Sequence, residues 1–158
     1  MMAASDKFEI TIQGRGGHGA HPYQTIDPIV VAANMVTALQ TIVSRNVHPL
    51  EAAVLSFGHI HAGAATAASV IPGQAKLVGT VRTFSDEVQK VVEARMRALI
   101  ESIAQGYGAS AEFNYLRNYP ATINTASCAD FVADVATDLF GADRVVRNLT
   151  PSMGSEDF

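Results

Sequence analysis

The chain has 158 residues, of which 48% are apolar and 16% are charged, and its formal net charge is −4. This composition is typical of folded globular chains and excludes general disorder. The basic residues are scattered and the apolar stretches are short, so we expect no nucleic-acid partner, no membrane span and no signal peptide. Cytoplasmic residence is the default expectation, and the single Cys128 excludes an intramolecular disulfide.

The N-terminal part of the chain predicts a strand, a glycine-rich turn and a long helix. Residues 1–6 show no periodicity, so we expect a cloning remnant or a disordered terminus there. Residues 8–13 alternate apolar and polar side chains, which indicates a strand with one buried face. Four glycines then surround His18, and Asp27-Pro28 has the form of a helix start.

Two further strands and a second helix are predicted in the middle of the chain. Residues 53–61 are rich in Val, Leu, Phe and Ile, and a strand pattern follows the Pro72-Gly73 turn over residues 76–84. Ser85 can cap a helix, because apolar side chains recur at helical spacing over residues 88–103. This helix therefore has one apolar stripe that can pack against a sheet.

A fourth strand, residues 111–115, completes the predicted topology. The fold class is therefore α+β, with a ferredoxin-like βαββαβ arrangement over residues 7–117: a four-stranded antiparallel sheet with two helices on one face. Residues 118–158 are expected to add a helix over residues 126–140 and a brief strand at Val145-Val146. This αβ tail closes no domain, so we expect it to be a partial segment of a second domain.

The glycine-rich segment 14–19 places His18 on a loop whose backbone can approach a ligand closely. The spacing of a phosphate-binding loop is absent, so a phosphate cradle is not predicted. The alternative is a tight turn that carries two surface histidines, His18 and His21.

Three other groups of residues are candidates for chemistry. His59 and His61 would share one side of a strand, but no third metal ligand follows at a recognisable spacing. Arg82 interrupts an apolar strand, so we expect it on the open face of the sheet, where its guanidinium fits a carboxylate; an intramolecular salt bridge is the alternative. The chain stops just after the paired carboxylates Glu156-Asp157, which leads us to expect a truncated chain.

These motifs together resemble blocks of the zinc aminoacylase and carboxypeptidase family of amidohydrolases, particularly its hippurate hydrolase and indoleacetyl-amino-acid hydrolase branch. The matching blocks are residues 14–28, Val70-Ile71-Pro72, residues 79–84 and residues 151–158, in the order found in that branch. The resemblance covers nearly the whole chain. It implies a lid that also forms the dimer, followed by the first elements of the returning catalytic domain.

The resemblance also implies a function for the full-length protein, which would be a homodimer that hydrolyses the amide bond of N-acyl amino acids with zinc or another divalent metal. The family's metal ligands are not in this sequence, so the chain alone is expected to hold no metal cofactor and to be inactive. His18 would stabilise the oxyanion in the partner subunit's active site, and Arg82 would bind the substrate carboxylate. Ser69, a further candidate for substrate binding, stands where the family usually has Asn.

The alternative is a stand-alone regulatory module, in which a ferredoxin-like domain binds a small molecule without catalysis. A metal-ligand segment upstream in the same reading frame would exclude it. For either function we expect a homodimer joined along residues 53–61, because a free edge strand needs cover. The acyl group, the preferred amino acid and the metal do not follow from the sequence, nor do roles for His21, the His59/His61 pair and Glu156-Asp157.

Overall fold

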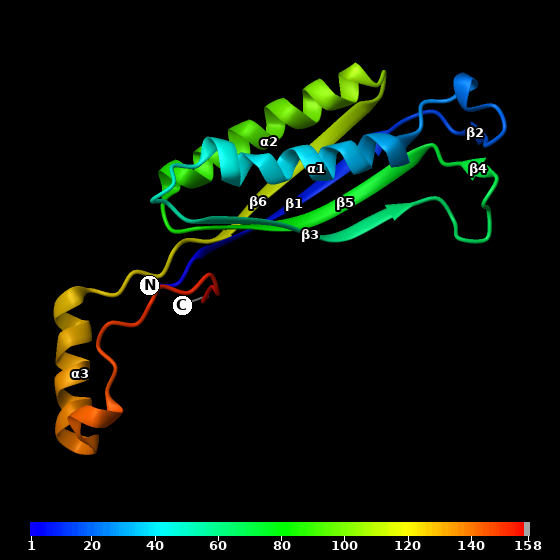
Figure 1. Cartoon of the computed structure of the whole chain (residues 1–158). Coiled ribbons are helices and arrows are strands. Elements are labelled where there is room, and N and C mark those ends of the chain that lie inside the picture. The colour runs from blue at the N-terminus through cyan, green and yellow to red at the C-terminus, as the bar shows by residue number, and fades with distance from the viewer. Residues whose placement is uncertain (157–158) are drawn as a thin grey trace.

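The structure, a computed structural model, describes residues 1–156 and consists of a sheet layer, a helix layer and a C-terminal tail (Figure 1). The four-stranded sheet is antiparallel, with strand order β3-β5-β1-β6. The α+β, βαββαβ fold predicted from the sequence is confirmed. Its elements are β1 (Ala4–Gln13), α1 (Pro28–Asn46), β3 (Ala53–Ala62), β5 (Gln74–Thr83), α2 (Asp86–Gly106) and β6 (Ser110–Tyr119).

Both helices of the layer begin where the sequence predicts, because a side chain caps each N-terminus. The Asp27 carboxylate accepts a hydrogen bond from the Ile29 N–H at 2.9 Å, and the Ser85 hydroxyl accepts one from the Val88 N–H at 3.3 Å. Pro28 occupies the first turn of α1, where a missing N–H costs nothing. Caps of this kind stabilise a helix by about 1 kcal/mol.

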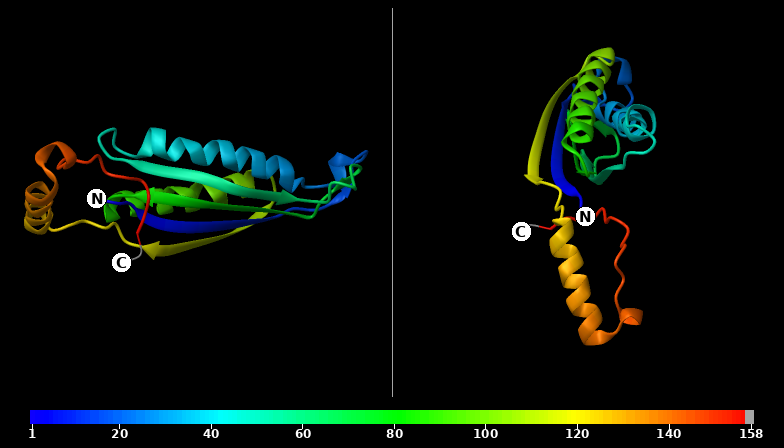
Figure 2. Two further views of the ribbon diagram at one scale, coloured as in Figure 1. Left: turned by 90° about the horizontal axis from the view of Figure 1, so that it is seen from below. Right: turned by 90° about the vertical axis from the view of Figure 1, so that its left-hand side faces the viewer.

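The core lies between the helix layer and one face of the sheet (Figure 2). Side chains of β1 alternate, so Phe8, Ile10 and Ile12 are fully buried while their neighbours face the open side. Each fully buried aliphatic side chain contributes about 1.5–3 kcal/mol through the hydrophobic effect. The helices supply the opposing layer: Val31, Met35, Leu39 and Ile42 from α1, and Val92, Met96 and Ile100 from α2.

Helix α1 is long and apolar enough, by length and composition alone, to cross a membrane. In the structure its apolar stripe packs on the sheet instead, with Met35, Leu39 and Ile42 at 0% exposure. Ile29 and Val30 at its start are about half exposed, and the rest of the outer surface carries mostly small and polar side chains such as Asn34 and Thr37. The helix therefore has the burial pattern of a core helix.

The N-terminus differs from the expectation. Residues 4–6 are not a disordered terminus but the first residues of β1, and residues 3–6 are all buried. Backbone pairing explains the difference, because Ala4 pairs with Thr83 and Asp6 with both Val81 and Arg117. The side chains in this stretch are small or polar, so a search for alternating hydrophobic residues does not detect the strand.

The C-terminal tail contains α3 (Ala126–Phe140), as predicted, but the expected strand at Val145-Val146 is wrong. A short 3-10 helix, η2 (Ala142–Arg144), is followed there by irregular chain. A strand needs a partner for its N–H and C=O groups, and none of the described residues pairs with this dipeptide. Helix α3 lies apart from the sheet (Figures 1 and 2), and Phe131 and Leu139 are about two-thirds exposed, at 67% and 70%.

Candidate functional site

His18 belongs to β2, which lies at the end of the sheet remote from the chain termini (Figure 1) and forms a small ladder that the sequence did not predict. β2 (Gly17–His18) pairs antiparallel with β4 (Val70–Ile71), and a short 3-10 helix, η1 (Pro22–Gln24), follows. Glycine is required at this close approach, because a Cβ on Gly16 would lie 2.7 Å from the Ile71 carbonyl oxygen. Two residues per strand are too few to give a sequence pattern.

The imidazole of His18 is exposed, and its position is set by the backbone of the following turn. The Ala20 N–H donates to His18 Nδ1 at 3.1 Å, and the His21 N–H donates to the His18 carbonyl at 2.9 Å. The His21 ring lies 5.8 Å from the His18 ring between centroids. The predicted loop histidine is thus an exposed side chain that a backbone hydrogen bond holds in place.

Ser69 lies beside the same loop, so the structure brings two of the candidate residues together. The Gly19 N–H donates to the Ser69 carbonyl at 2.7 Å, and Ser69 immediately precedes the strand that pairs with His18. This contact uses the backbone of Ser69 and leaves its exposed side chain out. The hydroxyl is therefore near the His18 end of the sheet and far from Arg82.

Arg82 lies near the other end of β5, on the open face of the sheet, as expected. Its neighbours Val81 and Thr83 are buried against the helices, so the alternation of β5 directs Arg82 to the opposite face. The half-buried guanidinium donates from Nη1 to the hydroxyl of Ser155 in the C-terminal Gly-Ser-Glu-Asp-Phe block. Two blocks that carry the family resemblance, 73 positions apart in sequence, therefore meet in space.

His18 and Arg82 are too far apart in one chain to contact the same small substrate. Arg82 pairs with Ser5, and Gln74 at the far end of β5 pairs with Gln13. Eight residues at about 3.3 Å each separate these two pairs by about 26 Å, and His18 lies beyond the second pair. A site that uses both side chains must therefore combine two copies of the chain.

The other histidine pair lies on the exposed edge strand β3. His59 and His61 face the same side with rings stacked at 6.2 Å between centroids, after a bulge that interrupts the register with β5 between Phe57 and His59. Within residues 1–156 no three His, Cys, Asp or Glu side chains are grouped closely enough to hold a metal ion. The residues present do not fit the zinc centre that the resemblance implies for the full-length protein.

A buried carboxylate, Asp6, was missed by sequence reasoning. It is only 1% exposed, and Oδ2 accepts hydrogen bonds from Tyr115 Oη at 2.6 Å and from Gln89 Nε2 at 2.8 Å. Burial, and then the hydrogen bond to this carboxylate, raise the pKa of the Tyr115 phenol well above its usual value. The sequence did contain a signal for this position. Asp6 is two residues before Phe8, so both side chains face the buried side of the strand. The cluster ties β1, α2 and β6 together.

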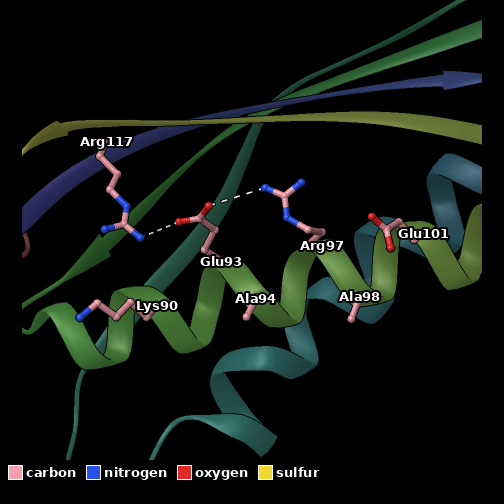
Figure 3. Close-up of a pocket in the computed structure, with 7 residues that line it drawn as sticks. All are labelled: Lys90, Glu93, Ala94, Arg97, Ala98, Glu101 and Arg117. Carbon is pink, nitrogen blue, oxygen red and sulfur yellow. Dashed lines mark hydrogen bonds and ion pairs between the residues drawn. The ribbon is translucent and has the colours of Figure 1, made fainter.

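A shallow groove of about 430 Å³ runs between α2 and β6 (Figure 3). Arg117 and Arg97 both approach the Glu93 carboxylate, at 2.7 Å and 3.6 Å. The hydrogen bond that Arg117 donates to the Glu93 carboxylate raises the pKa of the Arg117 guanidinium. Both arginines therefore already form ion pairs with Glu93 inside the groove.

Comparison with known proteins identifies the family of the chain. The peptidase dimerisation domain of the M20 family matches residues 4–108, more than half of the chain. A hippurate hydrolase of Campylobacter jejuni is 40% identical over all of this chain and 41% of its own length. An N-acyl-L-amino acid amidohydrolase of Geobacillus stearothermophilus is 48% identical over 78% of this chain and 33% of its own length.

Among solved structures, the YXEP protein of Bacillus subtilis, a dinuclear metal binding peptidase of the M20 family, has a TM-score of 0.65 and 32% identity. The match covers 100% of this chain and 35% of that one. The chain thus spans well under half the length of these relatives, and the match to the family includes the whole sheet except β6. The resemblance noted in the sequence is confirmed: the chain belongs to the M20 peptidase family and carries its dimerisation domain.

Proposed function

We propose that this chain is the dimerisation domain and adjoining segment of an amidohydrolase that cleaves the amide bond of N-acyl amino acids such as hippurate. The names of the two enzymes above support this substrate class. The chain would supply dimer contacts and substrate-binding groups, and would not hydrolyse substrate alone. Zinc or another divalent metal would be held by parts of the enzyme outside this sequence, as the dinuclear relative suggests.

The observation that carries the proposal is the placement of His18 and Arg82 at opposite ends of the sheet. β3 is an edge strand, so its outer N–H and C=O groups are free to pair with a second copy. Two-fold pairing of β3 edges sets the two sheets in opposite directions. The His18 end of one protomer then lies alongside the Arg82 end of its partner, where each site draws one residue from each chain.

The chemistry of the two side chains suits these roles. An imidazole N–H can donate to the oxyanion that develops when the amide carbonyl is attacked, a contribution of about 3 kcal/mol when the cleft is desolvated. A guanidinium offers two parallel donors to the carboxylate of the amino-acid moiety, and a charge-assisted pair of this kind is worth about 1.5–3 kcal/mol. Arg82 would exchange its contact with Ser155 for that carboxylate, or keep both.

Exposed apolar surface near the edge supports β3 as the seam. Ile60 on β3 is 59% exposed, and Ile29 and Val30 on α1, the helix that packs against β3, are 48% and 46% exposed. Such side chains on an otherwise polar edge fit the centre of an interface between copies. We therefore propose a homodimer joined through β3, as the sequence led us to expect.

Subunit mixing tests the proposal. The matching segment of the Campylobacter hippurate hydrolase is replaced by this chain, and His18→Ala and Arg82→Ala are made in separate copies. If the site is shared, a mixed dimer contains one intact site and one doubly altered site. The assay uses hippurate far below KM, where His18→Ala and Arg82→Ala alone are both nearly inactive. Random mixing makes half of the dimers mixed, so the mixture should recover about a quarter of the unaltered hippurate hydrolysis.

If both residues served the same protomer, every site in the mixed dimer would carry one alteration and no activity would return. That result would overturn the shared site. A replaced enzyme that folds, dimerises and binds metal but never hydrolyses hippurate would instead favour another substrate class or a regulatory role for this domain.

A further inference from the structure

The turn that carries His18 is closed by the histidine side chain itself. The backbone bond from the His21 N–H to the His18 carbonyl, at 2.9 Å, closes residues 18–21 into a turn. Inside it, the Ala20 N–H donates to His18 Nδ1 at 3.1 Å. Asn and Asp side chains commonly accept a hydrogen bond from the backbone two residues on, and here an imidazole nitrogen does the same.

This hydrogen bond determines where the imidazole carries its proton. A backbone N–H can only donate, so Nδ1 must offer a lone pair and cannot carry hydrogen. A neutral imidazole with an unprotonated Nδ1 has its proton on Nε2. We infer that the Ala20 N–H is a positioning group that holds His18 as a neutral imidazole whose Nε2–H is presented outward as a hydrogen-bond donor.

The inference deepens the proposed role of His18 and takes its catalytic meaning from that role. With Nδ1 occupied by the turn and Nε2 protonated, the ring has no free lone pair with which to take a proton or ligate a metal. What it offers an incoming substrate is one donor in a set direction. A donor suits the negative oxygen of a tetrahedral intermediate, because it needs no proton transfer and little reorganisation when the charge develops.

The chain contains an internal reference for this arrangement. The Leu50 N–H donates to His48 Nδ1 at 3.2 Å, also two residues along the chain, in the loop between α1 and β3. The His21 ring lies 5.8 Å from the His18 ring between centroids, and the Tyr23 ring lies 6.0 Å from that of His21. The two backbone-to-imidazole bonds should therefore be observable in one spectrum of one sample.

Nuclear magnetic resonance of the uniformly ¹⁵N-labelled 158-residue chain at pH 8 is the test. We expect a scalar coupling across the hydrogen bond between the Ala20 amide nitrogen and His18 Nδ1. The ¹⁵N chemical shift of Nδ1 should be that of an unprotonated nitrogen, and the shift of Nε2 should be that of a protonated one. The Leu50–His48 pair should give a matching coupling. Ala20→Pro removes the donor and should abolish the first coupling only, whereas the control Ala20→Gly keeps the N–H and should retain it.

A His18 signal with the proton on Nδ1, or no Ala20–His18 coupling while the Leu50–His48 coupling is seen, would overturn the inference. The wild-type spectrum decides this even if Ala20→Pro disturbs the loop. Its outcome is separate from that of subunit mixing. A confirmed coupling without shared activity would leave an ordered donor with another ligand, and shared activity without the coupling would leave the catalytic role but refute its positioning by Ala20.

Discussion

The two ends of the sheet hold their candidate side chains in different ways. At one end, His18 is placed by a turn of four residues and by backbone bonds from β2 and the adjoining glycine to β4 and Ser69. At the other end, Arg82 lies on a central strand and contacts Ser155, which is 73 positions away. The first end depends on local backbone geometry, and the second depends on how the C-terminal segment docks against the sheet.

Backbone bonds anchor the Arg82 end further. Met2 exchanges two hydrogen bonds with Thr122, each at 3.0 Å, and the Ala3 N–H lies 3.0 Å from the Ser152 carbonyl and 2.8 Å from that of Gly154. Three segments of the chain thus meet where the sheet joins the tail. Changes at the His18 end should therefore alter chemistry while leaving the fold intact, whereas changes near the Arg82 end can affect both binding and stability.

The largest effect is expected at the His18 end. In the segment-replaced hippurate hydrolase, His18→Ala should lower kcat about 100- to 1000-fold with little change in KM, because the donor acts on the oxyanion and not on the bound substrate. His18→Asn is the matched control, since an Asn side chain can keep the bond from the Ala20 N–H but has no donor at the Nε2 position. Steady-state kinetics and a thermal melt measure both variants.

If His18→Ala and His18→Asn lose kcat equally and His18→Asn keeps its melting temperature, the role of His18 as a hydrogen-bond donor is separated from its role in closing the turn. If His18→Asn kept normal kcat, closing the turn would be the whole role of this residue.

The next effect is expected at the Arg82 end and should fall on substrate binding. Arg82→Ala should raise KM for hippurate roughly ten- to several hundred-fold, since a charge-assisted pair worth about 1.5–3 kcal/mol is lost in ground and transition states alike. On the amide of hippurate, whose carboxylate is blocked, Arg82→Ala should have nearly the same KM as the unaltered enzyme. Equal losses on free and blocked substrates would rule out a carboxylate contact.

A smaller effect is expected from the buried cluster beneath the same end. Asp6→Ala leaves the Gln89 amide and the Tyr115 hydroxyl without their acceptor in the core, which should lower the free energy of unfolding by about 1–3 kcal/mol. Urea denaturation followed by circular dichroism measures the loss. Thr11→Ala, on the open face of the same strand, is the matched control and should change stability by less than about 0.5 kcal/mol. A similar loss in both variants would mean that the cluster adds nothing beyond strand propensity.

Sequence reasoning succeeded where the signal was local. Asp27-Pro28 and Ser85 marked both helix starts, and the cost of burying an unpaired guanidinium placed Arg82 on the open face. It failed where pairing partners decide the structure. Nothing in Gly17-His18 alone predicts a ladder with Val70-Ile71, and the buried start of β1 carries side chains that are usually exposed. The Arg82–Ser155 contact could likewise not be predicted from a sequence pattern, because it joins segments that only the fold brings together.

The smallest expected effect lies between the two ends, on the open face of the sheet. Glu9 has Lys7 and Lys76 each at 2.9 Å, and hydrogen bonds from these two lysines lower the pKa of Glu9 from 4.5 to about 2. Between these values the unfolded chain binds more protons than the folded one, so this contribution to stability is present above pH 4.5 and is lost as the pH falls towards 2.

Glu9→Gln should therefore narrow the difference in melting temperature between pH 6 and pH 2.5. The effect should be modest, because exposed ion pairs are screened by water and salt. Raising the salt concentration should further reduce the difference in melting temperature between pH 6 and pH 2.5 in the wild type and should leave that of the variant unchanged. The same acid sensitivity in Glu9→Gln and wild type would assign the pH dependence to other carboxylates of the chain and would rule out the lysine-paired Glu9 as its source.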